Sequence, residues 1–362
     1  MSVRFPSLSR GAILLVTLAA FGLAQSASRP APRKIEVAPG IWLFMTAPYG
    51  EVGLDGNSIA VLSRDGVLVF DSNGTPAAAS AVLSEIRALT DKPVRYLVHS
   101  HWHWDHWYGA QVYKEAFPSI EIITHEKTRE MMIGPAIQFN RPGLEKGLPG
   151  YITSLEQAPP GRIPDVQERL AMARFFLEQK KSVRHTFPTS TFKDRREISL
   201  GDRRIQVLNY GRAVTPGDTF IYLPNERVLI TGDLLVNPIS FALSCYPTEW
   251  LQVLEKLDAL DATVIVPGHG EPLRDKALLH ATRDVFRILL SRGRELKAKG
   301  LDADQAKDAI LPELRDLMVR ITGDDRARND AFRTQLVDWY LHRVYDEVDG
   351  PLTDAIAPIP PR

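Results

Sequence analysis

Four histidines and one aspartate fall within eight consecutive residues, from His99 to His106. The chain of 362 residues holds only nine histidines, so this crowding is its strongest chemical signal. Neutral imidazole and carboxylate are the usual ligands of zinc and similar divalent ions. His101 and His103 are two residues apart, which on an extended segment places both rings on one side, able to hold one ion. Asp105 and His106 follow across a turn and can hold a second.

Strands and helices must bring this cluster to the edge of a fold. The apolar stretch 94–98 predicts a strand that ends directly before His99. Strands are also expected at 41–45, 58–62 and 67–70, with a turn at 64–66, followed by a helix at 76–89. Downstream, the patterns predict strands at 120–124, 197–200, 204–208, 219–223, 227–231 and 263–267, and helices at 107–117 and 248–257. Layered α/β folds place their chemistry in loops at strand ends, where the cluster lies.

Two regions add helices to this framework. Residues 126–189 are interpreted as an insertion, with a Pro/Gly-rich loop at 143–161 and an amphipathic helix at 164–181. It is either a lid over the site or a decoration that buries its own apolar face. Residues 275–350 form a helical extension with helices at 275–298, 303–321 and 325–348. These helices pack on the main body, which we prefer, or on a second copy in a homodimer. A Pro-rich tail at 351–362 is expected to be flexible.

The N-terminus and the composition limit the classes of function. Arg4 and Arg10 precede an uncharged stretch at 11–24, which is typical of a signal peptide at 1–24 and too short for a stable membrane anchor. A linker follows at 25–34, so we expect a bacterial periplasmic or secreted protein. Removal of the signal peptide leaves 42 basic against 44 acidic residues. This balance argues against a nucleic-acid partner. With one cysteine, Cys245, no internal disulfide can form.

The segment from Ser100 to His106 resembles the signature of the metallo-β-lactamase superfamily. The resemblance extends over about residues 35–272, and we expect the corresponding domain at 35–274. Other motifs of the superfamily follow in its order: Phe70-Asp71-Ser72, Thr215-Pro216-Gly217-Asp218, Thr231-Gly232-Asp233 and Pro267-Gly268-His269-Gly270. The resemblance implies an α/β (α+β) fold, the four-layer αββα sandwich, with metal ions at one edge.

The same resemblance implies a ligand set, matched position by position. The first metal takes His101 and His103, and the second takes Asp105, His106 and His269. Asp233 bridges both metals. The metals would be one or two zinc ions or another divalent metal, and a metal-bound hydroxide would attack a carbonyl. Asp105 and Asp233 are therefore the candidate catalytic residues, with Asp105 orienting the nucleophile and moving its proton to the leaving group.

The sequence departs from the superfamily at one ligand of the first metal. Val214 stands before Thr215-Pro216-Gly217-Asp218 where a histidine is expected, and an isopropyl group cannot bind a metal. Three alternatives follow. In the first, which we favour, only the second site binds its metal tightly. In the second, His185, or less readily His125, replaces the missing ligand. In the third, the protein has lost catalysis and binds a ligand.

We therefore interpret the chain as an exported metal-dependent hydrolase of a small-molecule ester, thioester, lactone, amide or lactam. The alternative is a catalytically impaired binding protein on the same fold, and redox chemistry at iron ranks last. Trp107 and Tyr108 are the candidate residues of the substrate pocket. Trp102 and Trp104 alternate with the ligands and are expected to face away from it.

Overall fold

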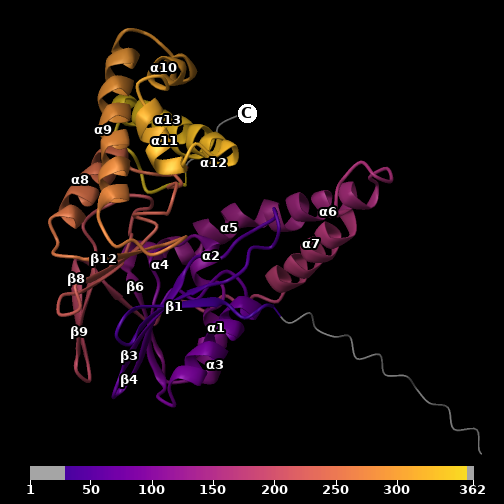
Figure 1. The fold of residues 1–362 in the computed structure, drawn as a ribbon, viewed down its shortest axis with the longest axis vertical. Coiled ribbons are helices and arrows are strands. Elements are labelled where there is room, and N and C mark those ends of the chain that lie inside the picture. Colours follow the sequence, from indigo (N-terminus) through magenta and orange to yellow (C-terminus); the bar gives the residue numbers. More distant parts are fainter. Residues whose placement is uncertain (1–28, 357–362) are drawn as a thin grey trace, which may run out of the picture.

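Two β-sheets pack face to face between layers of helices in the computed structural model, which describes residues 29–356 (Figure 1). The predicted signal peptide lies outside the described residues. The first sheet has seven strands in sequence order: β1 (Arg33–Ala38), β2 (Ile41–Met45), β3 (Ser58–Ser63), β4 (Gly66–Phe70), β5 (Val94–Val98), β6 (Glu121–His125) and β7 (Ser190–Phe192). The second sheet has five strands in the order β12 (Val264–Pro267), β11 (Val228–Gly232), β10 (Phe220–Leu223), β9 (Arg203–Leu208) and β8 (Arg195–Leu200).

The strand pairing changes from antiparallel to parallel where the site lies. β1 to β4 form an antiparallel meander, in which residues 64–65 make the tight turn between β3 and β4. β4, β5, β6 and β7 then pair in parallel, and β11 pairs in parallel with β12. Each parallel pair requires a crossover connection. The helix α1 (Pro76–Leu89) connects β4 to β5, and α8 (Pro247–Asp258) connects β11 to β12.

The remaining helices form three groups. Two short helices follow the histidine cluster, α2 (Trp104–Trp107) and α3 (Ala110–Ala116). The insertion contains α4 (Glu126–Ile133), α5 (Pro135–Pro142), the π-helical segment η1 (Gly143–Gly147), α6 (Leu148–Glu156) and α7 (Val166–Lys181). The C-terminal extension contains α9 (Ala277–Ala298), α10 (Ala303–Ile310), α11 (Arg315–Thr322), α12 (Arg326–Ala331), the π-helical segment η2 (Phe332–Asp338) and α13 (Trp339–Asp349).

Three hydrophobic clusters hold the layers together. Between the sheets, side chains such as Leu43 and Phe70 of the first sheet meet Val207 and Ile230 of the second. The outer face of the first sheet packs on α1 and α3. The outer face of the second sheet packs on α8, α9 and the C-terminal helices. This confirms the predicted four-layer αββα sandwich.

The insertion differs from the sequence prediction in one segment. Residues 143–161 were expected to form a loop because of their Gly and Pro content, but η1 and α6 occupy most of that range. Pro149 lies in the first turn of α6, where a helix needs no N–H from that residue. Ile152 and Leu155 of α6 pack against Leu170 and Ala173 of α7. This packing outweighs the weak intrinsic preference of the segment. α6 and α7 lie side by side and project from the sheets (Figure 1).

The C-terminal helices belong to the same core as the second sheet. The Phe286 ring of α9 lies with its centroid 4.6 Å from that of Trp250 on α8 and 4.4 Å from that of Tyr340 on α13. The predicted helix at 303–321 is interrupted around Pro312, which lacks the N–H that a helix interior requires. In the part of the chain that the structure covers, no helix is long and apolar enough to cross a membrane.

The start of the tail lies against the body, although we expected it to be flexible. The Leu352 carbonyl accepts a hydrogen bond from Arg212, and the Thr353 carbonyl accepts one from the Tyr246 hydroxyl. Asp354 lies 3.5 Å from both Lys127 and Arg212. These contacts hold residues 351–356, and residues 357–362 lie outside the described part.

We predict that Phe286→Ala lowers the free energy of unfolding by about 3–5 kcal/mol, because the substitution leaves a cavity between the packed helices α8, α9 and α13. Urea unfolding followed by tryptophan fluorescence and by circular dichroism measures this. Val319→Ala is the control, since Val319 is 40 % exposed, and it should change the value by no more than about 0.5 kcal/mol. A separate transition for the helices at low urea would contradict a shared core.

Candidate metal centre

The donor residues and Asp71 follow the carboxyl ends of β4, β5, β11 and β12. Asp71 follows β4, and the segment that carries His106 follows β5. Asp233 directly follows β11, and His269 comes two residues after β12. Carboxyl ends of parallel strands meet at one edge of a sheet. Because the two sheets pack face to face, four distant parts of the sequence converge at one point.

Two glycines allow the strand ends of the second sheet to approach closely. Gly268 donates its N–H to the Gly232 carbonyl at 2.8 Å. A Cβ atom on Gly268 would lie 2.0 Å from Asp233 Oδ1, so no other residue fits there. Gly232 adopts a φ of +53°, a conformation that glycine adopts without strain. The motifs around Asp233 and His269 therefore need their glycines for steric reasons.

Four side chains, Asp105, His106, Asp233 and His269, form a four-donor cage. His106 Nε2 lies 3.3 Å from Asp105 Oδ2, 3.4 Å from Asp233 Oδ1 and 3.3 Å from His269 Nε2. His269 Nε2 lies 3.1 Å from Asp105 Oδ2 and 3.5 Å from Asp233 Oδ1. A tetrahedral ion with ligand bonds of about 2.0–2.1 Å has ligand-to-ligand distances of about 3.3 Å. Asp105, His106 and His269 therefore lie close enough together to hold one divalent ion of the size of zinc, and Asp233 Oδ1 lies within 3.5 Å of both histidines.

Asp71 orients the ring of His106 from the side of the ring that faces away from the other three cage residues. Its Oδ2 lies 2.7 Å from His106 Nδ1, and its Oδ1 accepts a hydrogen bond from the Ser100 backbone N–H. With Nδ1 donating to Asp71, the lone pair of His106 Nε2 faces the other three donors. A carboxylate behind a ligating histidine fixes its tautomer in this way. The sequence motif contains Asp71, but the sequence alone did not reveal this role.

The charges of the cage require a cation. Burial disfavours a charged His106, but the carboxylates of Asp105 and Asp233 outweigh burial and hold the pKa of His106 well above its ordinary value. Burial also opposes ionisation of Asp105, yet His106 and His269 hold the pKa of that carboxyl well below its usual range. The carboxylates thus draw positive charge to the imidazole nitrogens, where a divalent ion can supply it.

The residues predicted for the first metal are less complete. His101 Nε2 lies 3.6 Å from Asp233 Oδ2 and has no hydrogen-bond partner among the described residues. The ring centroids of His101 and His103 are 4.5 Å apart. Burial lowers the pKa of His103 to about 4. Its ring is therefore neutral, and the nitrogen lone pair is free to bind a metal. However, the described residues contain no set of three mutually close donor atoms that includes His103.

The residues proposed to replace the missing ligand lie elsewhere. Val214 is buried in the apolar cluster around Phe220. The ring of His185 packs against those of Trp107 and Tyr108, with centroids 5.4 and 5.0 Å apart. His125 caps α4, because its Nδ1 accepts a hydrogen bond from the Lys127 N–H. Neither histidine belongs to a donor group among the described residues.

A cavity of about 330 Å³ opens beside the cage. Asp105, Asp233, His269 and His103 contribute to its wall. The rest of the wall is mainly apolar: Leu54, Trp102, Trp104, Phe139, Val236, Ile239, Phe241 and Leu243, with Asn140 and Gln335.

The predicted pocket residues need correction. Trp107 is fully buried and donates its indole N–H to the Trp102 carbonyl, and Tyr108 is only 6 % exposed. Neither lines the cavity, whereas Trp102 and Trp104 do. For Trp104, the prediction extended the alternation of a strand too far, because the helix α2 already begins at that residue. Beyond that residue the side chains follow the helical period.

The sequence profile of the metallo-beta-lactamase superfamily matches residues 52–269. The chain is 26 % identical to a linear primary-alkylsulfatase of Pseudomonas sp. (strain ATCC 19151), over 68 % of this chain and 48 % of the relative. It is 20 % identical to the 2,4-dinitroanisole O-demethylase subunit alpha of Nocardioides sp. (strain JS1661), over 63 % and 55 %. The chain thus spans about half the length of the curated relatives it matches.

Solved structures share the fold. A stereoselective inverting sec-alkylsulfatase from Pseudomonas sp. matches with a TM-score of 0.61 and 18 % identity, over 91 % of this chain and 52 % of that one. A metallo-beta-lactamase from Pontibacter korlensis matches with a TM-score of 0.51 and 17 % identity, over 71 % and 99 %. At these identities the likeness concerns the fold.

We predict that Asp71→Asn weakens zinc binding by about 10- to 100-fold, because the amide cannot supply the negative charge that supports His106. Asparagine tolerates the φ of +61° at this position, so the fold should persist. Competition with a chelator measures the dissociation constant. Asp258→Asn is the matched control, since it removes the carboxylate of another His–Asp pair, with His280. An unchanged dissociation constant in Asp71→Asn would show that Asp71 does not support the cage.

Proposed function

Because the chain belongs to the metallo-beta-lactamase superfamily, we propose that it is a metal-dependent hydrolase, and that its substrate is an ester with an uncharged reacting group and an apolar acyl or alkyl group. The observation that carries this proposal is the cavity of about 330 Å³ that joins three residues of the four-donor cage to an apolar wall. Thioesters and lactones share the same reacting carbonyl. The site, rather than the fold, supports this choice, since one fold hosts many reactions.

The charge of the site favours a substrate whose reacting group is uncharged. The residues that line this cavity include no lysine or arginine. One divalent ion would only balance Asp105 and Asp233, and Asp71 adds a further negative charge behind His106. A substrate with an anionic reacting group would therefore meet no net positive field. This argues for a carbonyl ester over a sulfate ester, although one relative is named as an alkylsulfatase.

The residues of the wall can do the remaining chemistry. A divalent ion in the cage would acidify a water molecule and polarise an ester oxygen. Asp105 and Asp233 both reach the cavity, so their carboxylates can orient that water and accept its proton. Asp105 can then return the proton to the leaving oxygen. The apolar wall binds the acyl chain and excludes water from the reacting bond.

We predict that the zinc-loaded protein hydrolyses 4-nitrophenyl esters and that kcat/KM rises by about fourfold per added methylene from acetate to butyrate, which is the gain from burying one methylene. Sodium octyl sulfate should be hydrolysed at least about 100-fold more slowly, since its anionic group meets no net positive charge at the site. Release of 4-nitrophenolate and of sulfate measures the two rates. Nitrocefin turnover serves as the comparison for a lactam.

Two histidine variants separate catalysis by the cage from background hydrolysis. His106→Ala should abolish ester turnover, while His280→Ala, outside the cage, should retain it. Faster hydrolysis of octyl sulfate than of the esters would overturn the substrate class. No turnover of any substrate by the zinc-loaded protein would favour the alternative of a binding protein on this fold.

A further inference from the structure

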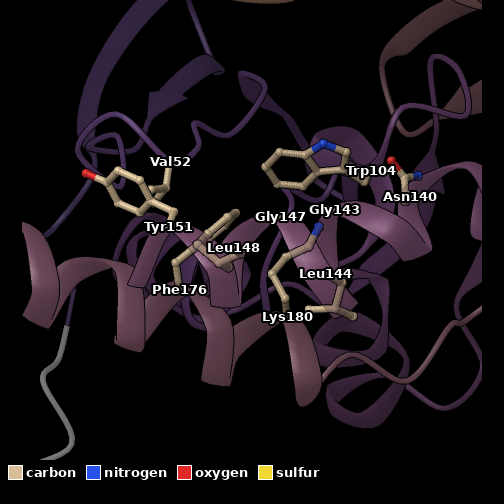
Figure 2. A pocket seen from close by; sticks show the side chains of 10 residues that line it. All are labelled: Val52, Trp104, Asn140, Gly143, Leu144, Gly147, Leu148, Tyr151, Phe176 and Lys180. Atoms are coloured by element: carbon tan, nitrogen blue, oxygen red, sulfur yellow. The ribbon is translucent and has the colours of Figure 1, made fainter. Parts of the chain in front are cut away.

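A second cavity, of about 360 Å³, lies beneath the insertion. Helices α5, α6 and α7 and the segment η1 provide most of its wall (Figure 2). It shares Trp104 and Asn140 with the cavity beside the cage. The two cavities therefore adjoin at these two side chains.

Lys180 is the only charged residue among those that line this second cavity. Its side chain points toward the ring of Trp104 (Figure 2). The ammonium nitrogen lies 3.6 Å from the centroid of Trp104 and 4.2 Å from that of Tyr108. Cation–π contacts of this kind hold an ammonium in place without neutralising its charge.

Among the described residues, no carboxylate lies within ion-pair distance of Lys180, whereas the adjacent Lys181 pairs with Glu178 at 3.0 Å. Burial lowers the pKa of Lys180 to about 7, against the opposing effect of Asp105 and Asp55. Because burial disfavours the charged form of Lys180, an anionic partner stabilises this ammonium more than it would stabilise that of an exposed lysine. The position is thus prepared for an anion that the described chain does not provide.

We propose that the second cavity is an anion subsite, in which Lys180 binds a carboxylate of the ligand while Trp104 and the apolar side chains around it bind the ligand's apolar body. In the proposed hydrolase, the substrate is then an ester that carries a carboxylate at a distance from the reacting bond. Only the identification of the carboxylate as part of the substrate rests on the proposed function. The binding of a carboxylate at Lys180 stands on the cavity alone.

Calorimetric binding of octanoate and of its neutral analogue octanamide tests the subsite. At pH 6, where Lys180 is protonated, the wild-type protein should bind octanoate at least about tenfold more tightly than octanamide, the gain from one charge-assisted hydrogen bond. Lys180→Met should reduce this ratio to below about twofold. Lys180→Gln provides a second neutral variant if the methionine variant does not fold. Lys181→Met is the matched control and should keep the wild-type ratio.

The measurement is made on zinc-loaded and on chelator-treated protein, because a carboxylate also binds zinc. A preference for octanoate in both forms is expected. A preference that appears only with zinc, or that persists in Lys180→Met, or equal binding of the two probes by the wild-type protein, would overturn the proposal. Failure of the ester panel with an intact preference for octanoate would refute the hydrolase and leave the subsite standing.

Discussion

The site depends on the balance of charge among the carboxylates and imidazoles that lie at the ends of four strands. Asp71, Asp105 and Asp233 converge on His106 and His269 within a site that is largely closed to water. Buried carboxylates that lie close to one another repel unless cations lie between them. A divalent ion in the four-donor cage meets this requirement. The sheets, the close glycine contacts and the crossover helices serve to bring these groups to one point.

Much of the scaffold could be predicted because its signals are local. Apolar stretches bounded by turns marked the strands, and the ligand motifs stand directly after four of them. The six predicted ligand residues lie at one edge of the sandwich, with His103 on the wall of the cavity. What the sequence could not show depends on tertiary contacts. The role of Asp71 requires that β4 and β5 be neighbours, and the place of Lys180 requires that α7 fold back over Trp104.

The wrong predictions share a physical cause, which is that a local pattern was extended beyond the element that supports it. The alternation that was used to assign Trp104 ends where α2 begins. The Gly and Pro content of residues 143–161 suggested a loop until packing of α6 on α7 decided otherwise. Both errors concern the substrate side of the site. That side is built by the insertion and by short helices, where packing outweighs propensity.

The two metal positions of the superfamily are unequal in this chain. Asp105, His106 and His269 offer one set of mutually close donors, and Asp233 lies within 3.5 Å of both of those histidines. His101 shares a second set with His106 and Asp233, but His103 belongs to no such set among the described residues, and Val214 is buried in the apolar cluster around Phe220. A site with four protein ligands binds tightly and must add a fifth ligand, or loosen one, to react. The tightly bound ion is therefore expected in the cage, and the first position is expected to bind a metal only weakly.

Zinc content per chain tests this directly. Plasma mass spectrometry on protein dialysed against zinc and then against metal-free buffer should find about one ion in the parent, about two in Val214→His and none in His106→Ala, since four-ligand sites retain zinc. About two ions in the parent would contradict the account and show that another residue completes the first site. No ion in the parent would contradict the cage itself.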